Sequence, residues 1–372
     1  MTPSSKSKKK ELAAALALAE AAEIKLKASE VPPAPLKYDG EINRVLIIGM
    51  SGYLGSALAL GLRDDFEVFG TYNKRFVHMR GTTSLALDAM NTGDIVDTIK
   101  RVQPDIILYC AGIPDPETCQ KEKDRAEQLH VKAPSLVLKT SIRPPQFIYF
   151  SADQVFGVVP EGFNPPFLDR SLTSPINTLG NTKAQAETMI ATGTKGSHIL
   201  RCGPLFGEGF GSANGFRRTW IEGLVRRLES GEKMQLPLGQ IRSHLYVGDF
   251  IRAVRSFLKN IPADSCIYNI APRDSLTLVE FGKYFCQELD FDPELIRLAE
   301  SDDSSGVVVK SKDSSLSSNL FEHHFDFQFT TIRDSMREFA HRLQYGKTGN
   351  WMDRAPIKKV VKEEIPPEPI PG

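Results

Sequence analysis

The sequence has no long apolar run, no excess of either charge and no paired cysteines, and each absence excludes a class of protein. No apolar stretch approaches the roughly 20 residues that a membrane-spanning helix needs, so no membrane partner is expected. Lysine plus arginine and aspartate plus glutamate each number 46, and this balance gives no support for a nucleic-acid partner. The five cysteines contain no Cys-x-x-Cys pair, which argues against a metal site and favours a reducing compartment.

The first 40 residues lack arginine and lack the uninterrupted apolar stretch of a secretory signal, so a cytoplasmic location is expected. Residues 10–27 are rich in alanine, leucine and glutamate and are predicted to be helical. The proline-rich run 31–35 ends that helix. We therefore predict a separate N-terminal extension over residues 1–40, which is either a frayed tail or a helix that docks on a partner.

Short apolar runs alternate with helical patterns from residue 41 onwards. The run 44–48 is β-branched and is typical of a buried parallel strand, and a helix is predicted over 53–62. Further strands are predicted at 66–70, 105–109 and 146–151, and further helices at 94–102 and 126–140. This alternation predicts an α/β fold with a doubly wound parallel sheet, the Rossmann architecture that binds NAD or NADP.

The alternation breaks after residue 201, which predicts a second, smaller lobe at the C-terminal side. Residues 41–202 and 244–272 are expected to form the Rossmann core, and residues 203–243 and 273–345 the smaller, substrate-type lobe. Together they make one domain over 41–345. Residues 346–372 are rich in lysine, glutamate and proline and are predicted to form an extended tail.

Three glycines stand where the first predicted strand meets its helix. In the run Gly49-Met50-Ser51-Gly52-Tyr53-Leu54-Gly55, the first glycine permits a tight turn and the second lets the backbone approach a pyrophosphate. The third allows the helix to pack closely on the strand, so that the phosphate lies at the helix N-terminus. The predicted cofactor-binding residues of this loop are Gly49, Ser51, Gly52, Tyr53, Leu54 and Gly55.

The end of the second predicted strand bears on the choice of cofactor. An acidic residue there would bind the ribose 2′-hydroxyl of NAD, whereas this chain has Asn73, Lys74 and Arg75. Basic side chains in this place favour the 2′-phosphate of NADP, while an ordinary solvated charge pair is the alternative. Further predicted cofactor contacts are Asp88, near the adenine, and Cys110, Ala111 and Gly112, beneath the cofactor.

Several motifs follow one another in the order that is typical of one enzyme family. They are residues 49–55, Cys110-Ala111-Gly112, Ser151-Ala152-Asp153-Gln154-Val155-Phe156-Gly157, and Pro-Ile-Asn-Thr-Leu-Gly-Asn-Thr-Lys at 175–183. Over residues 42–343 the chain resembles the extended short-chain dehydrogenase/reductase family. It is most similar to the branch of the dTDP-4-dehydrorhamnose reductases and the methionine adenosyltransferase regulatory (beta) subunits.

The resemblance implies a catalytic Ser or Thr, a Tyr and a Lys, supported by an Asn, and this chain keeps only the lysine. Ala152 stands at the Ser/Thr position, Leu179 at the tyrosine and His130 at the asparagine, while Lys183 is retained. Ser151 lies beside Ala152 but is expected to point to the opposite face of its strand. A positioned proton donor is worth roughly 10²–10⁴ in rate. Its loss predicts a site that binds NADP (or NAD), with Lys183 on the ribose, without turnover.

These observations leave three functions open. The preferred one is a non-catalytic, NADP-binding subunit, regulatory or structural, that meets a protein partner through the N-terminal helix and the proline-rich C-terminal tail. The second is an active NADP-dependent reductase or epimerase of a nucleotide sugar, with His130, Tyr149 or a water as substitute proton donor. The third is a structural fold with an empty nucleotide groove. Arg242 is the candidate arginine of the substrate lobe, from its position in the resemblance.

Overall fold

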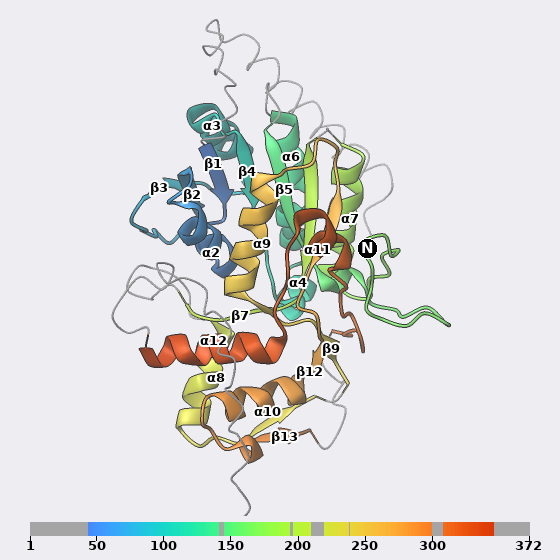
Figure 1. The fold of residues 1–372 in the computed structure, drawn as a ribbon. Coiled ribbons are helices and arrows are strands. Elements are labelled where there is room, and N and C mark those ends of the chain that lie inside the picture. The colour runs from blue at the N-terminus through green and yellow to red at the C-terminus, as the bar shows by residue number, and fades with distance from the viewer. Residues whose placement is uncertain are drawn as a thin grey trace, which may run out of the picture.

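The computed structural model describes residues 44–140, 145–193, 196–209, 219–237, 239–299 and 308–345. The predicted N-terminal extension and the proline-rich tail lie outside these described residues. An α/β body with a central sheet stands above a smaller, mainly helical lobe (Figure 1). Within the described part of the chain, no helix is both long enough and apolar enough to span a bilayer.

A seven-stranded sheet forms the centre of the α/β body, with the strand order β11-β6-β5-β4-β1-β2-β3. Every pairing in it is parallel. The strands are β1 (Arg44–Ile48), β2 (Glu67–Tyr72), β3 (Thr82–Ala86), β4 (Ile106–Tyr109), β5 (Gln146–Ala152), β6 (Ser197–Cys202) and β11 (Ile267–Ile270). The order reverses between β1 and β4, and ligands bind at such a point in open α/β sheets. The predicted doubly wound parallel sheet is confirmed.

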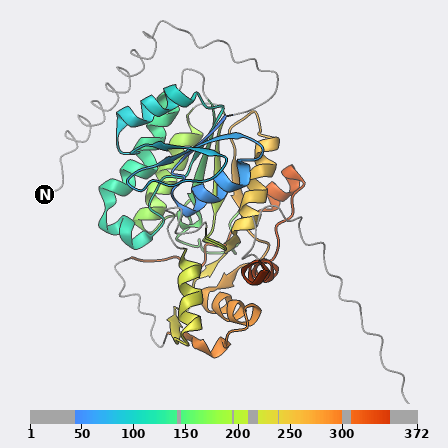
Figure 2. The ribbon, with the colours of Figure 1, turned by 90° about the vertical axis from the view of Figure 1, so that its left-hand side faces the viewer.

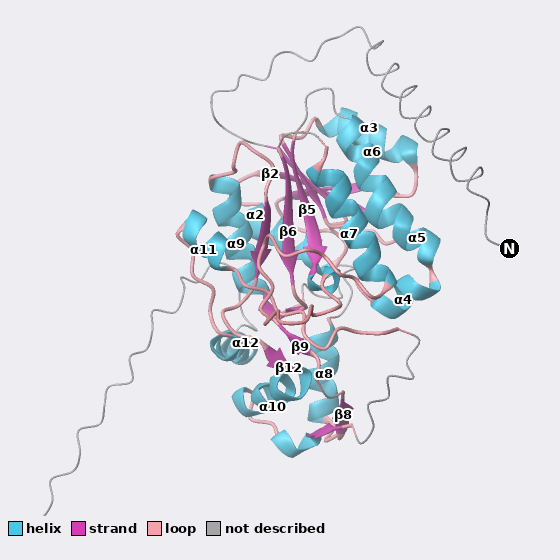
Figure 3. Ribbon diagram, turned by 90° about the vertical axis from the view of Figure 1, so that its right-hand side faces the viewer, coloured by secondary structure: helices cyan, strands magenta, loops and turns pink. Residues whose placement is uncertain are grey.

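Helices cover both faces of the sheet because its central strands are apolar on both sides. In β1, Val45 and Ile47 belong to one buried cluster, and Leu46 and Ile48 belong to another on the opposite face. Figure 3 shows the first face covered by α2 and α9 and the second by α3, α6 and α7. These helices are α2 (Tyr53–Leu62), α3 (Thr92–Val102), α6 (Ala133–Thr140), α7 (Thr178–Ala191) and α9 (Val247–Lys259).

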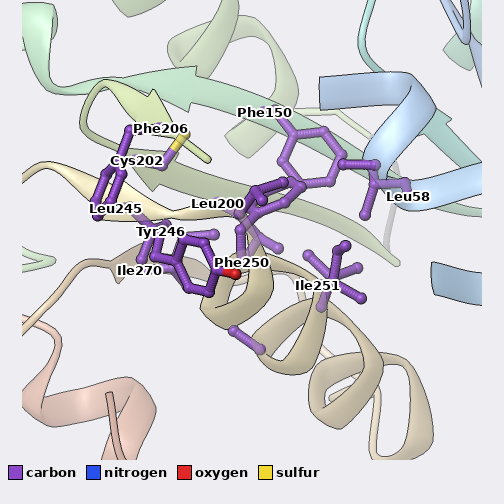
Figure 4. Packing of buried hydrophobic residues seen from close by; sticks show 14 of the residues in the cluster. Leu58, Phe150, Leu200, Cys202, Phe206, Leu245, Tyr246, Phe250, Ile251 and Ile270 are labelled. Atoms are coloured by element: carbon purple, nitrogen blue, oxygen red, sulfur yellow. The ribbon is translucent and has the colours of Figure 1, made fainter. Parts of the chain in front are cut away.

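The core beneath α2 and α9 holds the first face together. Figure 4 shows Leu58 of α2 and Phe250 of α9 beside Phe150 and Leu200 of the sheet. The rings of Phe150 and Phe250 meet edge to face, with centroids 5.5 Å apart. This packing fixes the carboxyl end of β5, where the candidate site lies.

The segment predicted as one helix over 126–140 is instead built from several shorter elements. After α4 (Pro116–Lys121) come α5 (Lys123–Glu127), a π-helical turn (Gln128–Lys132) and then α6. Two buried phenols donate to carbonyls of the π turn. Tyr109 Oη bonds the Leu129 carbonyl at 2.7 Å, and Tyr149 Oη bonds the His130 carbonyl at 3.0 Å. The turn carries His130 and faces α7.

The smaller lobe lies beyond the carboxyl edge of the sheet (Figure 2). Its helices are α8 (Trp220–Glu229), α10 (Leu278–Glu288) and α12 (Ile332–Tyr345), with the 3-10 turn η4 (Pro293–Leu295). Short two-stranded sheets join β7 (Leu205–Phe206) to β10 (Leu245–Tyr246), β8 (Met234–Leu236) to β13 (Ile296–Leu298), and β9 (Ile241–Arg242) to β12 (Leu276–Thr277). Capping boxes begin α8 and α10, where a threonine and a glutamate satisfy each other's backbone amides.

One helix lies in a different place from the one expected. Residues 273–345 were expected to lie in the smaller lobe, but α11 (Asn319–Phe325) contacts β11 at the edge of the main sheet. Phe321 and Phe325 pack beside Tyr268 of that strand, and Tyr268 Oη lies 2.7 Å from His324 Nδ1. The helix therefore covers the outer edge of the Rossmann core, because its two phenylalanines share that apolar cluster.

Candidate functional site

The glycine loop joins β1 to α2 at the carboxyl edge of the sheet. Gly49 has a φ of +96°, and a Cβ on it would lie 2.7 Å from the Ala111 nitrogen. A Cβ on Gly55 would lie 2.4 Å from the Gly49 oxygen. Gly52 is different: it is exposed, and a Cβ there would meet only the Gly49 oxygen, at 3.4 Å. The first and third glycines therefore build the turn, whereas Gly52 leaves space in front of the helix.

The N-terminus of α2 is suited to an anion. Its N-cap is Gly52, which offers no capping side chain, and the first turn contains no acidic residue. Helix N-termini are usually capped by a side-chain oxygen, and an uncapped one presents backbone N–H groups and the positive end of the helix dipole. The Gly49 amide donates to Thr71 Oγ1 at 2.9 Å, which ties the loop to β2. The loop thus fits a pyrophosphate at the point where the strand order reverses.

The residues predicted to choose the cofactor lie at the same edge. Asn73, Lys74 and Arg75 follow β2 directly and are exposed, and β2 lies beside β1 in parallel. Asp88 follows β3 and uses its carboxylate locally, accepting from the Met90 amide at 3.0 Å. Asp88 therefore closes the turn before α3, and its contact with an adenine stays a prediction.

The residues that follow β4 form the floor beside the glycine loop. Ala111 is the residue against which Gly49 packs, and the partly buried Cys110 packs against the cluster beneath α2 and α9. Burial raises the pKa of the Cys110 thiol well above its usual value, so the thiol stays protonated at neutral pH. Gly112 is exposed, and a Cβ on it would lie 2.9 Å from His130 Nε2. The floor and the π turn are therefore in direct contact.

Lys183 is the residue predicted to be retained from the family's catalytic set, and its ammonium reaches the end of β5. Nζ donates to the Phe150 carbonyl at 2.8 Å and lies 4.5 Å from the centroid of the Tyr149 ring. Burial lowers the pKa of this amine to about 8, so the ammonium form still predominates at neutral pH. The partner of the ammonium is thus a backbone carbonyl and an aromatic face, not a hydroxyl.

The residue predicted to replace the catalytic tyrosine is buried by packing. Leu179 is 3 % exposed and belongs to the apolar cluster on the α3, α6 and α7 face. Ala152 ends β5 beside Cys202 of β6. Ser151 lies on the same strand face as Tyr149, as alternation requires, and Ala152 lies on the opposite face. Ser151 Oγ is buried and has no hydrogen-bond partner among the described residues.

His130 is fixed in one neutral form by its two ring contacts. Nε2 lies 2.9 Å from the backbone amide of Ile113, which can only donate, so Nε2 is the acceptor. Nδ1 then carries the proton, and it lies 2.8 Å from Thr182 Oγ1. Burial, followed by the charge of Lys183, lowers the pKa of His130 to about 2. The ring is 0 % exposed, so it connects the floor to α7 and offers no titratable proton near neutral pH.

Comparison with known proteins identifies the family. Residues 43–345 match the model of the RmlD substrate binding domain. The chain belongs to this family. It lies within the extended short-chain dehydrogenases/reductases, as the resemblance predicts. The methionine adenosyltransferase 2 subunit beta of Danio rerio is 25% identical over 316 residues, which cover 82% of this chain and 94% of that protein.

Solved structures show the same fold as this RmlD-family chain. A dTDP-4-dehydrorhamnose reductase from Bacillus anthracis, in complex with NADP, superposes with a TM-score of 0.68 at 20% identity, covering 80% of this chain and 99% of that one. The enzyme WbmG from Bordetella bronchiseptica, in complex with NAD, gives 0.67 at 17% identity, covering 84% and 97%. Both of these structures thus hold a nicotinamide dinucleotide.

Arg242 of this RmlD-family chain lies in a buried network at the junction of the two lobes. It is 6 % exposed, and Nη1 lies 3.5 Å from Asp153 Oδ2 and donates to Ser314 Oγ. Ser314 Oγ in turn donates to Asp153 Oδ2 at 2.8 Å. The charge of the guanidinium is therefore balanced within the chain. A contact between Arg242 and a ligand stays a prediction.

A buried ion pair that the sequence reasoning missed holds the helix of Lys183. Arg201 of β6 meets Glu187 of α7 with two parallel bonds, 2.9 Å from Nε to Oε1 and 2.7 Å from Nη2 to Oε2. Arg201 also donates to the Asp169 carbonyl at 3.0 Å. Removing one partner of such a pair costs about 3–5 kcal/mol. The only sequence signal is that Glu187 stands four residues after Lys183, on the same helix face.

Proposed function

We propose that this chain is a non-catalytic, NADP-binding member of the RmlD family that serves as a regulatory or structural subunit of a larger assembly. One observation carries the proposal: Leu179, which the resemblance places at the phenol position, is buried in an apolar cluster. Hydride transfer to a carbonyl leaves an oxyanion that must take a proton from a positioned acid. A leucine supplies none, and Lys183 is held by the Phe150 carbonyl.

The two side chains weighed as substitute donors support the proposal. His130 is neutral, and both of its ring nitrogens are engaged by Ile113 and Thr182. Tyr149 is fully buried, its hydroxyl donates to the His130 carbonyl, and burial raises the pKa of its phenol. Neither group offers a proton toward the carboxyl edge of the sheet, where a dinucleotide would bind.

The glycine loop supports binding of a dinucleotide, and the end of β2 supports NADP. Gly52 leaves open space before an uncapped helix N-terminus, which suits a pyrophosphate. Lys74 and Arg75 follow β2 where NAD-specific folds carry an acid, and they would meet a 2′-phosphate. Lys183 would hold the hydroxyls of the nicotinamide ribose.

A subunit role rests on the relative with the same span. The Danio rerio protein named as subunit beta of methionine adenosyltransferase 2 matches this chain over 94% of its own length. By that likeness, we infer that this chain also acts by binding a protein partner. The N-terminal extension over 1–40 and the tail over 346–372 are the candidate docking segments, and both lie outside the described residues.

The test joins a binding measurement to a turnover measurement on the full-length protein. Titration with NADPH, followed by its fluorescence, should show saturable binding that Gly52→Asp weakens about tenfold or more, because a carboxylate there repels the pyrophosphate. NADPH absorbance should stay constant when 4-keto nucleotide sugars are added. Steady oxidation of NADPH by the wild type would refute the proposal, and absence of NADPH binding would leave the fold purely structural.

One observation favours a second function, an active NADP-dependent reductase or epimerase of a nucleotide sugar. The pKa of Lys183 is lowered to about 8, and an amine of that pKa can act as a general acid near neutral pH. Turnover by this route would fall as the pH rises through about 8, because the ammonium form is lost. The variant Lys183→Met would abolish it, whereas His130→Asn would not.

A further inference from the structure

A stretch of this neutral chain carries charge of one sign only. Between Glu67 and Asp88 the sequence has no acidic residue, yet it contains Lys74, Arg75 and Arg80, with His78 among them. Lysine plus arginine and aspartate plus glutamate are equal in number over the whole chain. The local imbalance is therefore a feature of this segment alone.

The stretch is the connection from β2 to β3, and its side chains alternate between the core and the solvent. Val77 and Met79 are buried beneath it, while Phe76, His78 and Arg80 are exposed. Two side chains of β3 hold the backbone of the connection. Ser84 Oγ donates to the Val77 carbonyl at 2.7 Å, and Thr82 Oγ1 donates to the Met79 carbonyl at 2.9 Å. The backbone that carries the exposed side chains is thus held in place by hydrogen bonds from β3.

An aromatic ring stands among these cations. Phe76 is 59 % exposed, and its only ring contact among the described residues is with Tyr72, edge to face at 5.3 Å. Within the described part of the chain, neither Lys74 nor Arg80 forms an ion pair. We name Lys74, Phe76, His78 and Arg80 the basic edge.

The basic edge lies at the outer limit of the molecule. Strand β3 ends the seven-stranded order, and Figure 1 shows it at the left margin of the sheet, with the blue connection beside it. Lys74 lies near the carboxyl end of β2, where a 2′-phosphate would bind, whereas Arg80 lies near the amino end of β3. The surface therefore extends well beyond what one phosphate needs.

We propose that the basic edge docks an acidic segment of a partner protein. Interfaces are enriched in aromatic and arginine side chains, and complementary charge speeds encounter and fixes register. Here an exposed phenyl ring offers an apolar contact, and cations on both sides of it would pair with carboxylates. The inference rests on the proposed subunit function and names the chemistry of the partner's contact segment.

The number of cations favours a protein over a nucleic acid. Proteins that bind duplex DNA with useful affinity neutralise on the order of 6–10 phosphates. The basic edge offers two full cations, Lys74 and Arg80, together with His78, and Arg75 lies beside them. A few carboxylates of a peptide match this charge, while a nucleic acid would lack partners over most of its length.

The experiment uses the full-length protein and a defined probe. The probe is a short labelled peptide in which glutamate alternates with leucine, and binding is followed by fluorescence anisotropy at low ionic strength. The variant Arg80→Glu should weaken binding about tenfold, because it replaces an attraction with a like charge. Phe76→Ala should weaken it as well. The matched control is Arg101→Glu, an exposed arginine on α3, which should bind the peptide as the wild type does.

Further measurements separate this inference from the proposed function. NADPH affinity should be unchanged in Arg80→Glu, so loss of peptide binding with normal NADPH binding supports a separate docking surface. Normal NADPH binding with no peptide binding by the wild type would overturn the inference alone. The inference is also overturned if a lysine–leucine peptide or an oligothymidine binds as tightly as the glutamate–leucine peptide. A peptide of this chain's own residues 363–372 tests the tail as the alternative occupant. If that peptide binds more tightly than the glutamate–leucine probe, the occupant is the tail and the inference of a partner protein is overturned.

Discussion

The two halves of the candidate site depend on different parts of the chain, one on backbone atoms and the other on side chains. The half at β1 and α2 depends on backbone: Gly49 packs on Ala111, Gly55 packs on Gly49, and the helix amides face the space before Gly52. The half at β5 and α7 depends on single side chains, and there neither Ala152 nor Leu179 carries a hydroxyl, while Lys183 donates to the Phe150 carbonyl. We propose the first as the binding half, which is inseparable from the fold, and the second as the catalytic half, in which one side chain decides proton donation.

The largest expected effect comes from comparing Gly55 with Gly52 in the binding half, because one substitution should lower stability and the other should lower NADPH affinity. Gly55→Ala would place a Cβ 2.4 Å from the Gly49 oxygen and should lower the free energy of unfolding by about 1–3 kcal/mol. Gly52→Ala meets its nearest atom only at 3.4 Å and should leave the free energy of unfolding within about 0.5 kcal/mol of the wild type.

Urea denaturation of both variants measures these free energies, and titration with NADPH gives the matching affinities. Gly52→Ala should lose NADPH affinity despite its normal stability, because its Cβ enters the space left for the pyrophosphate. Equal destabilisation by the two substitutions would show that the second glycine is also structural, and the comparison between the two halves would fail.

Much of the binding half is predictable from sequence, because its signals are local. The glycine spacing, the β-branched run before it and the missing acid after β2 all lie within one strand–helix–strand unit. The alternation of strands and helices likewise predicts the parallel sheet. The order of the strands then fixes where the glycine loop and the Cys110–Gly112 floor meet.

The other half depends on contacts between distant residues, which no local pattern reports. The π turn that carries His130 replaces part of a predicted regular helix, and its two phenol partners come from β4 and β5. The pairs Arg201–Glu187 and Arg242–Asp153 join separate elements. The predicted loss of the hydroxyls is visible in the sequence. The neutral state of His130, with both ring nitrogens in hydrogen bonds, is not.

The next prediction tests whether the catalytic half lacks only a proton donor. The double variant Leu179→Tyr with Ala152→Thr restores the hydroxyls that the resemblance implies at these two positions. Burying a phenol in the place of a leucine should lower the free energy of unfolding by about 1–3 kcal/mol, since this cluster is close-packed.

The matched variant for this test is Leu179→Phe with Ala152→Thr, which has the same bulk without the hydroxyl. We expect the tyrosine variant, and not the phenylalanine variant, to oxidise NADPH slowly in the presence of a 4-keto nucleotide sugar. Turnover in both would show that bulk and not the hydroxyl matters, and the assignment of the phenol position would be wrong.

The smallest expected effect is on the pH dependence of stability, and it concerns His130, which connects the residues after β4 to α7. The pKa of His130 is lowered to about 2 in the folded protein, against about 6.5 in an unfolded chain. The unfolded state therefore binds more protons below about pH 6.5, and the folded state loses stability as the pH falls, by at most about 1.4 kcal/mol per pH unit from this group.

The variant His130→Asn removes the titrating ring, and the asparagine can still accept from the Ile113 amide. Its stability, measured by urea denaturation between pH 7 and pH 5, should fall less steeply than that of the wild type. Parallel profiles would mean that His130 is protonated as easily in the folded state as in the unfolded state. The ring would then be able to donate a proton, and the contrast between a binding half and an inert half would lose its main support.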